Sequence, residues 1–350
     1  MSSRVELVPG GVQLTTGPWP SPASPSWVLV LPQTVGLCSS DLKEVRRSRD
    51  VRSDFGHEMV GVVHSSSMDD FPPGLRVCLD PHIPVTRTTA FSETALLEGT
   101  PDQLRAALPT VLDGTPDDRA VFTEPLACAV HCAGKVPVGS DVAIVGAGTA
   151  GVLLAVLLRL KGCQVTLVNR STARLTVLSA MALLREVPKV LNSEVGTRTF
   201  STVVVTTASL DDTTFDSAWN LLPRDGGRLV LFGGIRPDWR VPGTDVRLDG
   251  IRRGEEAYEL ELDGRRALLV GTHGATGADF AAAGAVLAAP LPWTAGHIEE
   301  LIVDRVTLPG LAALLNDAVR TGADPIGKHL VDIGRHPSPA GTSCSTGADP

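Results

Sequence analysis

The stretch Asp141–Gly151, DVAIVGAGTAG, decides the fold of the central part of this chain. A short apolar run leads directly into Gly146, Gly148 and Gly151, and a helical pattern opens at once. A strand, a G-x-G-x-x-G loop and a helix in this order predict a dinucleotide-binding βαβ unit. The alternative is an ordinary glycine-rich turn, which the second strand that follows argues against.

Each position of this loop has a physical role in binding a pyrophosphate. Gly146 permits the tight turn, Gly148 lets the pyrophosphate approach the backbone, and Gly151 lets helix and strand pack closely. The helix N-terminus, where Thr149 and Ala150 lie, supplies partial positive charge to the phosphates. These five residues are therefore the expected centre of the cofactor site.

The end of the second strand indicates which cofactor binds. Dinucleotide sites for NAD carry an acidic residue here, which binds the ribose 2′-hydroxyl. In this chain the strand ends in Asn169, followed by Arg170 and, further on, Arg174. A carboxylate would repel a 2′-phosphate, whereas Asn and Arg would bind it, so we expect NADP(H) rather than NAD(H). The alternative is that Asn169 caps a helix and Arg170 is a solvated charge.

Outward from the loop, strands alternate with helices, which predicts a parallel sheet with helices on both faces. The expected strands are residues 141–145, 165–169, 202–206, 228–232 and 266–271, with helices at 150–161, 173–184 and 215–222. Upstream of residue 122, short alternating strands and turns prevail, and a helical pattern covers 125–135. Downstream, we expect helices at 279–288 and 308–320 and a strand at 329–333.

This pattern divides the chain into three parts. We expect a β-rich domain over residues 1–136, completed by 276–335, and a dinucleotide-binding domain over 137–275. Residues 336–350 are rich in Pro, Ser and Gly and are expected to be disordered.

Composition excludes several classes of function. With 31 basic and 39 acidic residues among 350, the net charge is −8, which argues against nucleic acid or an anionic membrane as partner. The six cysteines are irregularly spaced, which predicts a reducing compartment, the cytoplasm, and no secretory signal is visible.

Three short segments carry candidate metal ligands: GLCSSD with Cys38, GHE with His57 and Glu58, and TEPL with Glu124. One thiolate, one imidazole and one or two carboxylates suit zinc, and three protein ligands leave a position for water or substrate. Taken singly, each segment has a plainer explanation, a buried cysteine or a surface His-Glu pair. Their co-occurrence with the glycine loop favours a catalytic site.

The chain resembles the zinc-dependent medium-chain dehydrogenase/reductase family, which includes alcohol, sorbitol, threonine and glucose dehydrogenases. The resemblance rests on six stretches in family order between residues 30 and 335: GLCSSD, FGHEMVGVV, TEPLACAVH, VAIVGAGTAGVL, GGRLVLFGG and GKHLVDIG. It implies an α/β architecture, with a GroES-like β-rich catalytic domain and a doubly wound Rossmann domain.

The resemblance also implies roles for the site residues. Cys38 and His57 would bind a catalytic zinc, with Glu58 or Glu124 as a further ligand, a choice that the sequence leaves open. Asp41 would accept a hydrogen bond from His57 and fix its tautomer, and Ser40 would relay the proton of the reacting hydroxyl.

The chain departs from the family in two places. Many members hold a structural zinc on four cysteines, but between Arg76 and Glu124 this chain has only Cys78, which predicts one zinc per chain. The family implies a homodimer or homotetramer, although the missing lobe often contributes to that interface. The stretch 236–265 is longer and more charged than expected. Lys43 either continues the proton relay or, as we favour, is a surface side chain.

The leading hypothesis is a zinc-dependent oxidoreductase that transfers a hydride between NADP(H) and a secondary alcohol or ketone of a polyol, sugar or cyclitol, in secondary-metabolite biosynthesis. One alternative is a zinc-free quinone or enoyl reductase of the same fold. Another is a non-catalytic nucleotide-binding protein. Metal analysis separates the first two, and the sequence leaves substrate and physiological direction undetermined.

Overall fold

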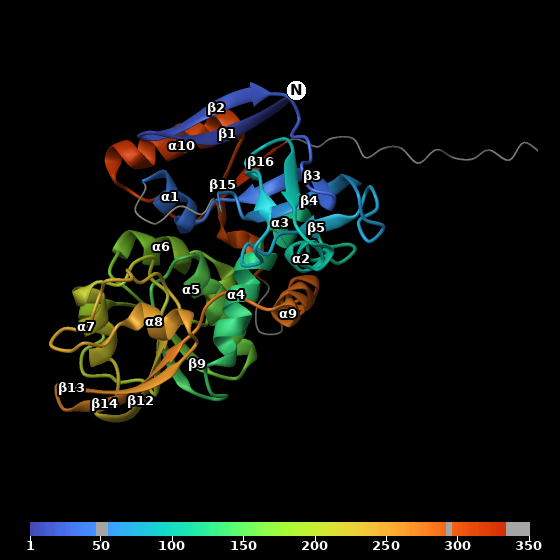
Figure 1. Ribbon diagram of the computed structural model, residues 1–350. Helices are drawn as coiled ribbons and strands as arrows, with labels where there is room; N and C mark the ends of the chain where they lie inside the picture. The colour runs from blue at the N-terminus through green and yellow to red at the C-terminus, as the bar shows by residue number, and fades with distance from the viewer. Residues whose placement is uncertain (47–54, 292–295, 334–350) are drawn as a thin grey trace, which may run out of the picture.

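The computed structural model describes residues 1–46, 55–291 and 296–333. It contains two seven-stranded sheets and a two-stranded one. In Figure 1 the strands that flank the glycine loop lie in the lower half, and the N-terminal strands lie above them. The expected disordered tail, 336–350, lies outside the described residues.

The lower sheet has the strand order β10-β9-β8-β11-β12-β14-β13. All its pairs are parallel except β13–β14. The order reverses between β8 and β11, and in doubly wound sheets ligands bind at such a switch point. The strands are β8 (Asp141–Val145), β9 (Gln164–Asn169), β10 (Lys189–Leu191), β11 (Thr202–Val205), β12 (Asp225–Leu231), β13 (Ala257–Leu262) and β14 (Arg265–Gly271).

Both faces of this sheet are covered, because successive side chains of a strand point to opposite faces. Along β8, Val142 and Ile144 join one buried cluster, and Ala143 and Val145 join another. The helices are α5 (Thr149–Leu160), α6 (Thr172–Ser179), α7 (Asp212–Asn220) and α8 (Leu248–Arg253), with 3-10 turns η1 (Ala182–Leu184) and η2 (Asn192–Glu194). The helix expected over 173–184 is thus wrong in extent: it ends at Ser179 and a 3-10 turn follows.

The upper sheet joins both ends of the chain. Its path is β15-β16-β3-β4-β5, with β7 pairing β3 and β6. The strands are β3 (Trp27–Gly36), β4 (Glu58–Ser66), β5 (Arg76–Cys78), β6 (Thr86–Arg87), β7 (Ala95–Glu98), β15 (Ile302–Val306) and β16 (Lys328–Asp332), and β1 (Ser2–Val8) and β2 (Gly11–Gly17) form the separate hairpin. Strand β16 pairs antiparallel with β3, so the C-terminal segment returns to the N-terminal one.

The remaining helices connect and cover these sheets. Helix α4 packs against both α5 and α9, and so lies between the two halves of the molecule (Figure 1). The helices are α1 (Ser39–Val45), α2 (Pro101–Ala107), α3 (Asp117–Ala120), α4 (Thr123–Gly134), α9 (Gly277–Ala288) and α10 (Leu308–Thr321), with the 3-10 turn η3 (Ile298–Leu301). The domain boundaries given above remain predictions.

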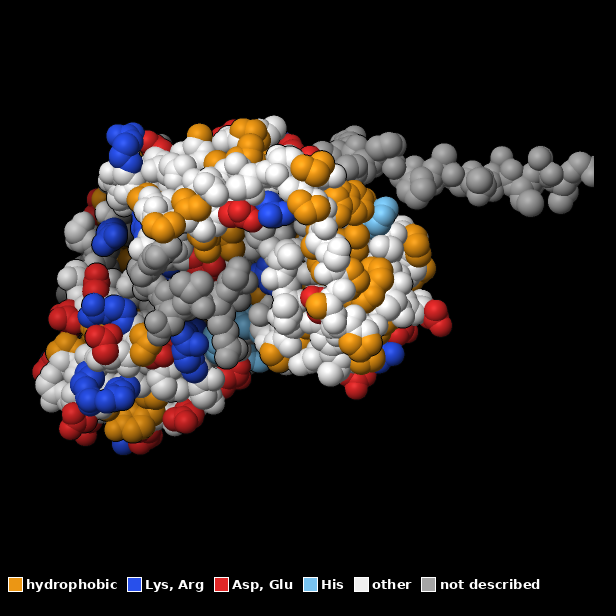
Figure 2. Space-filling model, turned by 45° about the horizontal axis from the view of Figure 1, so that its top comes forward, with side chains coloured by type: hydrophobic (Ala, Val, Ile, Leu, Met, Phe, Trp, Pro, Cys, Tyr) orange, Lys and Arg blue, Asp and Glu red, His pale blue; other side chains and the backbone are white. Residues whose placement is uncertain are grey.

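The charged stretch 236–265 contains helix α8 and strand β13, which extends the lower sheet beyond β14. Glu259 and Glu261 on β13 are exposed at this edge. Charged side chains on an edge strand disfavour pairing with another chain. Figure 2 shows Lys, Arg, Asp and Glu interspersed over the lower left of the visible face, with no single-sign field there. Among the described helices, none is long and apolar enough to cross a membrane.

Candidate active site

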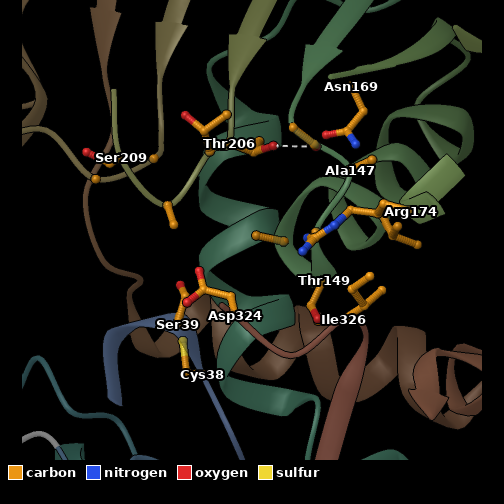
Figure 3. Close-up of a pocket in the computed structure, with 18 of the residues that line it drawn as sticks. Cys38, Ser39, Ala147, Thr149, Asn169, Arg174, Thr206, Ser209, Asp324 and Ile326 are labelled. Carbon is orange, nitrogen blue, oxygen red and sulfur yellow. Dashed lines mark hydrogen bonds between the residues drawn. The ribbon is translucent and has the colours of Figure 1, made fainter. Parts of the chain in front are cut away.

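A cavity of about 810 Å³ runs along the carboxyl ends of the lower sheet and reaches the first residues of α1. Asn169 and Arg174 line one end, and Cys38 lies at the other (Figure 3). Cavities of roughly 300–1,000 Å³ are typical of sites for cofactors and small ligands. The candidate cofactor residues and the candidate metal ligands therefore share one continuous space.

The glycine loop has three distinct local geometries. Gly146 has φ +114°, a backbone conformation that side chains rarely adopt. A Cβ at position 151 would lie 2.0 Å from the carbonyl oxygen of Gly146, so helix α5 and strand β8 meet without room for a side chain. At Gly148 a Cβ would meet only the Arg174 Nη1, at 3.3 Å. The backbone at Gly148 is thus open to the cavity and faces a guanidinium.

Polar and basic side chains surround the end of β9. The Asn169 side-chain amide donates to the Ser171 carbonyl oxygen at 3.2 Å. The Ser171 hydroxyl caps α6 by accepting from the backbone N–H of Arg174 at 3.3 Å. Arg170 also lines the cavity and helps to lower the pKa of Asp211, an effect due first to hydrogen bonding from Thr214. No acidic residue ends this strand.

The chemistry at the other end centres on a compact group of three side chains. Cys38 is the N-cap of α1, and His57 and Glu58 lie at the start of β4. A ligand atom of each lies within 4.8 Å of the other two. A thiolate, an imidazole and a carboxylate at this separation fit a zinc ion.

Asp41 lies beside Nδ1 of the His57 ring, and Ser40 lies beside Nε2. The Asp41 Oδ1 lies 3.6 Å from Nδ1, and the same carboxylate accepts from the backbone N–H groups of Gly56 and Cys38. The Ser40 hydroxyl lies 3.3 Å from Nε2. Burial opposes protonation of His57, but Asp41 and Cys38 outweigh it and raise its pKa well above the usual value. The carboxylate thus favours a proton on Nδ1, which leaves Nε2 to face a metal.

Glu58 is balanced by a buried cation. The side chain of Lys328, from β16, forms an ion pair with Glu58, and both are almost fully buried. Burial lowers the pKa of Lys328, but attraction to Glu58 outweighs it and the pKa is raised. Sequence reasoning missed this residue, although it belongs to the stretch GKHLVDIG. The available signal was a lysine at the first position of the strand KHLVD.

Glu124 lies on α4, is 6% exposed and lines the same cavity. The Cys128 thiol, one turn further along α4, donates to its carboxylate at 3.5 Å. Burial raises the pKa of Glu124, and nearby His57 partly offsets this. The structure brings Glu58, and not Glu124, into the group with Cys38 and His57, whereas Glu124 groups with His82 and Cys128. The sequence had left Cys128 without a role.

Comparisons with known proteins match both halves of the chain. The model of the alcohol dehydrogenase GroES-like domain matches residues 24–115. The model of an FAD binding domain matches residues 139–183, from just before β8 to the end of α6 and η1. A G-x-G-x-x-G unit binds the pyrophosphate of FAD and of NAD(P) alike. A D-arabinitol dehydrogenase of Uromyces fabae is 37% identical over 82 residues, which are 23% of this chain and 22% of that protein.

Solved structures show the same fold over nearly the whole chain. A protein of Sinorhizobium meliloti described as a zinc-binding dehydrogenase bound to NADP has a TM-score of 0.71 at 20% identity, covering 95% of this chain and 99% of its own. The galactitol-1-phosphate dehydrogenase of Escherichia coli has a TM-score of 0.68 at 20% identity, with coverage of 95% and 100%. The 2R,3R-butanediol dehydrogenase of Bacillus subtilis has a TM-score of 0.69 at 16% identity, with the same coverage. The expected fold is confirmed, and the match to the alcohol dehydrogenase GroES-like domain agrees with the expected N-terminal domain.

Proposed function

We propose that this chain, which has the GroES-like domain and the fold of the zinc-dependent medium-chain dehydrogenases, is a zinc-dependent oxidoreductase that uses NADP(H). The substrate would be a secondary alcohol, or its ketone, within a polyol, sugar or cyclitol. The observation that carries the proposal is the single cavity, which joins the glycine loop and Arg174 to Cys38, His57 and Glu124.

The proposed zinc ligands are Cys38, His57 and Glu58, supported by the mutual proximity of their ligand atoms. Glu124, in the cavity wall, would face the fourth coordination position of the zinc, which the three protein ligands leave open. Lys328 offsets the charge of Glu58, which limits the excess negative charge of the site. When bound, zinc polarises the carbon–oxygen bond of the substrate, and the nicotinamide accepts or gives the hydride.

The chain's own residues orient the reactants and move the proton. Asp41 holds the ring of His57 through Nδ1, and the Ser40 hydroxyl lies beside Nε2. Its position beside His57 supports the proposed role of Ser40, which is to accept the proton of the reacting hydroxyl and pass it outward. Glu124 is almost fully buried and Cys128 partly buried, and both line this end of the cavity.

The cofactor end supports NADP(H) rather than NAD(H). Asn169 stands where NAD sites carry an acidic residue, and Arg170 and Arg174 line the cavity beside it. Two arginines would bind the 2′-phosphate and pyrophosphate, which are the charged groups of the cofactor.

The similar proteins support the polyol class by their names. D-arabinitol, galactitol 1-phosphate and 2,3-butanediol all carry neighbouring hydroxyls. A reducing cytoplasmic location, a homodimer or homotetramer, and a role in secondary metabolism remain proposals.

A screen of NADP⁺ reduction over polyols, cyclitols and simple secondary alcohols, with the reverse reaction on ketones, tests this function. We expect turnover with at least one polyol or cyclitol. Absence of turnover in either direction by zinc-loaded protein, or turnover only with enones, would overturn the proposal.

A further inference from the structure

Two histidines from different halves of the molecule meet beside Glu124. His82 lies in the loop after β5, and His273 follows β14. Their rings pack edge to face, with centroids 5.5 Å apart and an interplanar angle of 88°. Gly274 has φ +70°, and a Cβ there would lie 3.1 Å from the Cδ2 of His82. His82 thus rests against the backbone at the end of the lower sheet, which fixes its position.

Arg252 determines the tautomer of His273. The Arg252 Nη1 lies 3.1 Å from Nδ1 of the ring, and its Nη2 donates to Asp249 at 3.2 Å. A guanidinium only donates, so Nδ1 must accept and the proton of the neutral ring is on Nε2. Burial and the charge of Arg252 lower the pKa of His273 to about 4. At neutral pH, His273 therefore presents a fixed N–H donor at Nε2.

Asp80 favours the opposite tautomer in His82, with the proton on Nδ1. Its Oδ1 lies 3.2 Å from Nδ1 of His82 and 2.9 Å from the backbone nitrogen of the same residue. The carboxylate only accepts, so it favours a proton on Nδ1. Among the described residues, neither histidine has a hydrogen-bond partner at Nε2. In both rings, Nδ1 is therefore hydrogen-bonded by the protein and Nε2 is available to a ligand.

This pair lies close to the proposed reaction site. A ring nitrogen of His82 lies within 4.8 Å of a carboxylate oxygen of Glu124 and of the Cys128 sulfur. Glu124 and Cys128 line the wall of the cavity that contains Cys38. His82 is exposed to solvent beside that wall and does not itself line the cavity, so it would meet only a substituent that extends past Glu124.

We propose that His82 and His273 form a subsite that binds the hydroxyl neighbouring the reacting carbon of the substrate. The inference rests on the proposed function and narrows it to substrates with vicinal hydroxyls. The Nε2–H of His273 donates to the hydroxyl oxygen, and His82, whose Nδ1 is held by Asp80, forms a hydrogen bond with the same hydroxyl through Nε2. A substrate without this hydroxyl would lose both hydrogen bonds, which lowers its kcat/KM relative to the hydroxylated substrate.

The test compares the best alcohol from the screen with its analogue lacking the neighbouring hydroxyl. We expect wild-type kcat/KM to favour the hydroxylated substrate. His82→Phe and His273→Phe, which retain an aromatic ring, should each reduce that ratio about ten-fold or more. His273→Gln, which restores an N–H donor, should retain most of the preference. His64→Phe, a change at a residue that packs on Trp19, is the matched control and should leave the ratio unchanged.

The outcomes separate this inference from the proposed function. Active His82→Phe and His273→Phe variants with the wild-type ratio would overturn the subsite while leaving the dehydrogenase intact. The subsite is also wrong if His273→Gln and His273→Phe lose the preference equally, because a purely packing role would give that result. If the wild type oxidises neither alcohol and reduces neither ketone, the proposed function fails and the subsite fails with it.

Discussion

Cys38 combines two tasks at the residue scale. It is the N-cap of α1, and its sulfur belongs to the group formed with His57 and Glu58. Removing the thiol deletes the softest ligand of the proposed site, whereas the backbone that caps α1 remains.

Cys38→Ala should therefore lose bound zinc and turnover while it keeps the fold. Metal analysis, initial rates and circular dichroism measure the three properties. Cys132→Ala is the matched control, because Cys132 is fully buried in the core around α4 and belongs to neither ligand group. Full activity in Cys38→Ala would show that the metal assignment is wrong.

Arg170 is the residue on which the cofactor prediction most depends. It lines the cavity directly after Asn169, at the end of β9. Hydrogen bonds to charged groups contribute about 1.5–3 kcal/mol, so the loss of one changes binding about ten-fold or more.

Arg170→Ala should reduce the preference for NADPH over NADH, measured as the ratio of kcat/KM values, about ten-fold. Arg236→Ala, at an exposed arginine outside the cavity lining, should leave the ratio unchanged. A wild-type enzyme that already favours NADH would contradict the cofactor assignment.

At the scale of elements, two glycines of the loop have different roles. Gly151 lets helix α5 and strand β8 pack closely, and Gly148 leaves room for the cofactor. A methyl at position 151 would collide with the Gly146 carbonyl oxygen, whereas one at 148 would meet only the flexible end of Arg174. Overpacking at a rigid contact costs about 1–3 kcal/mol.

Gly151→Ala should lower the melting temperature, because strand β8 and helix α5 must move apart. Gly148→Ala should melt like the wild type but bind NADP(H) weakly, since its methyl occupies the approach of the pyrophosphate. Thermal unfolding and cofactor titration distinguish the variants. Equal stability and equal affinity in both would refute this division of roles.

Elements with a strong local pattern were predictable from the sequence. Strands β8, β9, β12 and β14 are apolar runs bounded by turns, and each was placed to within a few residues. Strand β13, AYELEL, was missed, although its glutamates alternate with apolar residues, because it lies in a stretch noted only for its length and charge. The break after Ser179 escaped because the apolar period continues into Leu183 and Leu184, whose burial is decided by tertiary packing.

The site residues that belong to short sequence motifs were predictable. Cys38, His57 and Glu58 were named from GLCSSD and GHE, and the structure brings them together. The contacts from Lys328 to Glu58 and from Arg252 to His273 were not predictable. Lys328 is 270 residues from its partner, and His273 and Arg252 meet only because β13 and β14 fold back as a hairpin.

At the scale of the whole molecule, polar contacts join the two halves on more than one side. The Lys43 side chain, from α1, donates to the Ala208 carbonyl oxygen beyond β11, so this lysine, expected at the surface, reaches across the cavity. On the other side, Glu255 accepts from Lys135 and from His131, both at 2.7 Å, in a link between α8 and α4.

Burial opposes ionisation of Glu255, but hydrogen bonds from Lys135 and His131 outweigh it and lower its pKa. A lowered folded-state pKa adds stability above the unfolded value, about 4.3, and that stability is lost as pH falls through the folded value. Glu255→Gln should therefore destabilise the protein at pH 7, by about 1 kcal/mol or less. The deficit should shrink below about pH 4. Chemical denaturation at several pH values measures it, and a deficit that grows toward acid would contradict the link.

We expect that zinc held at Cys38, His57 and Glu58, at the end of the cavity opposite Asn169, is required for alcohol oxidation. The most direct test of this requirement is the zinc content and NADP⁺-reduction rate of one preparation, measured as purified, after chelation and after zinc is restored. We predict one zinc per chain, loss of activity when the metal is removed, and recovery of activity when zinc is restored. A purified protein without zinc that still reduces an enone with NADPH at full rate would contradict it.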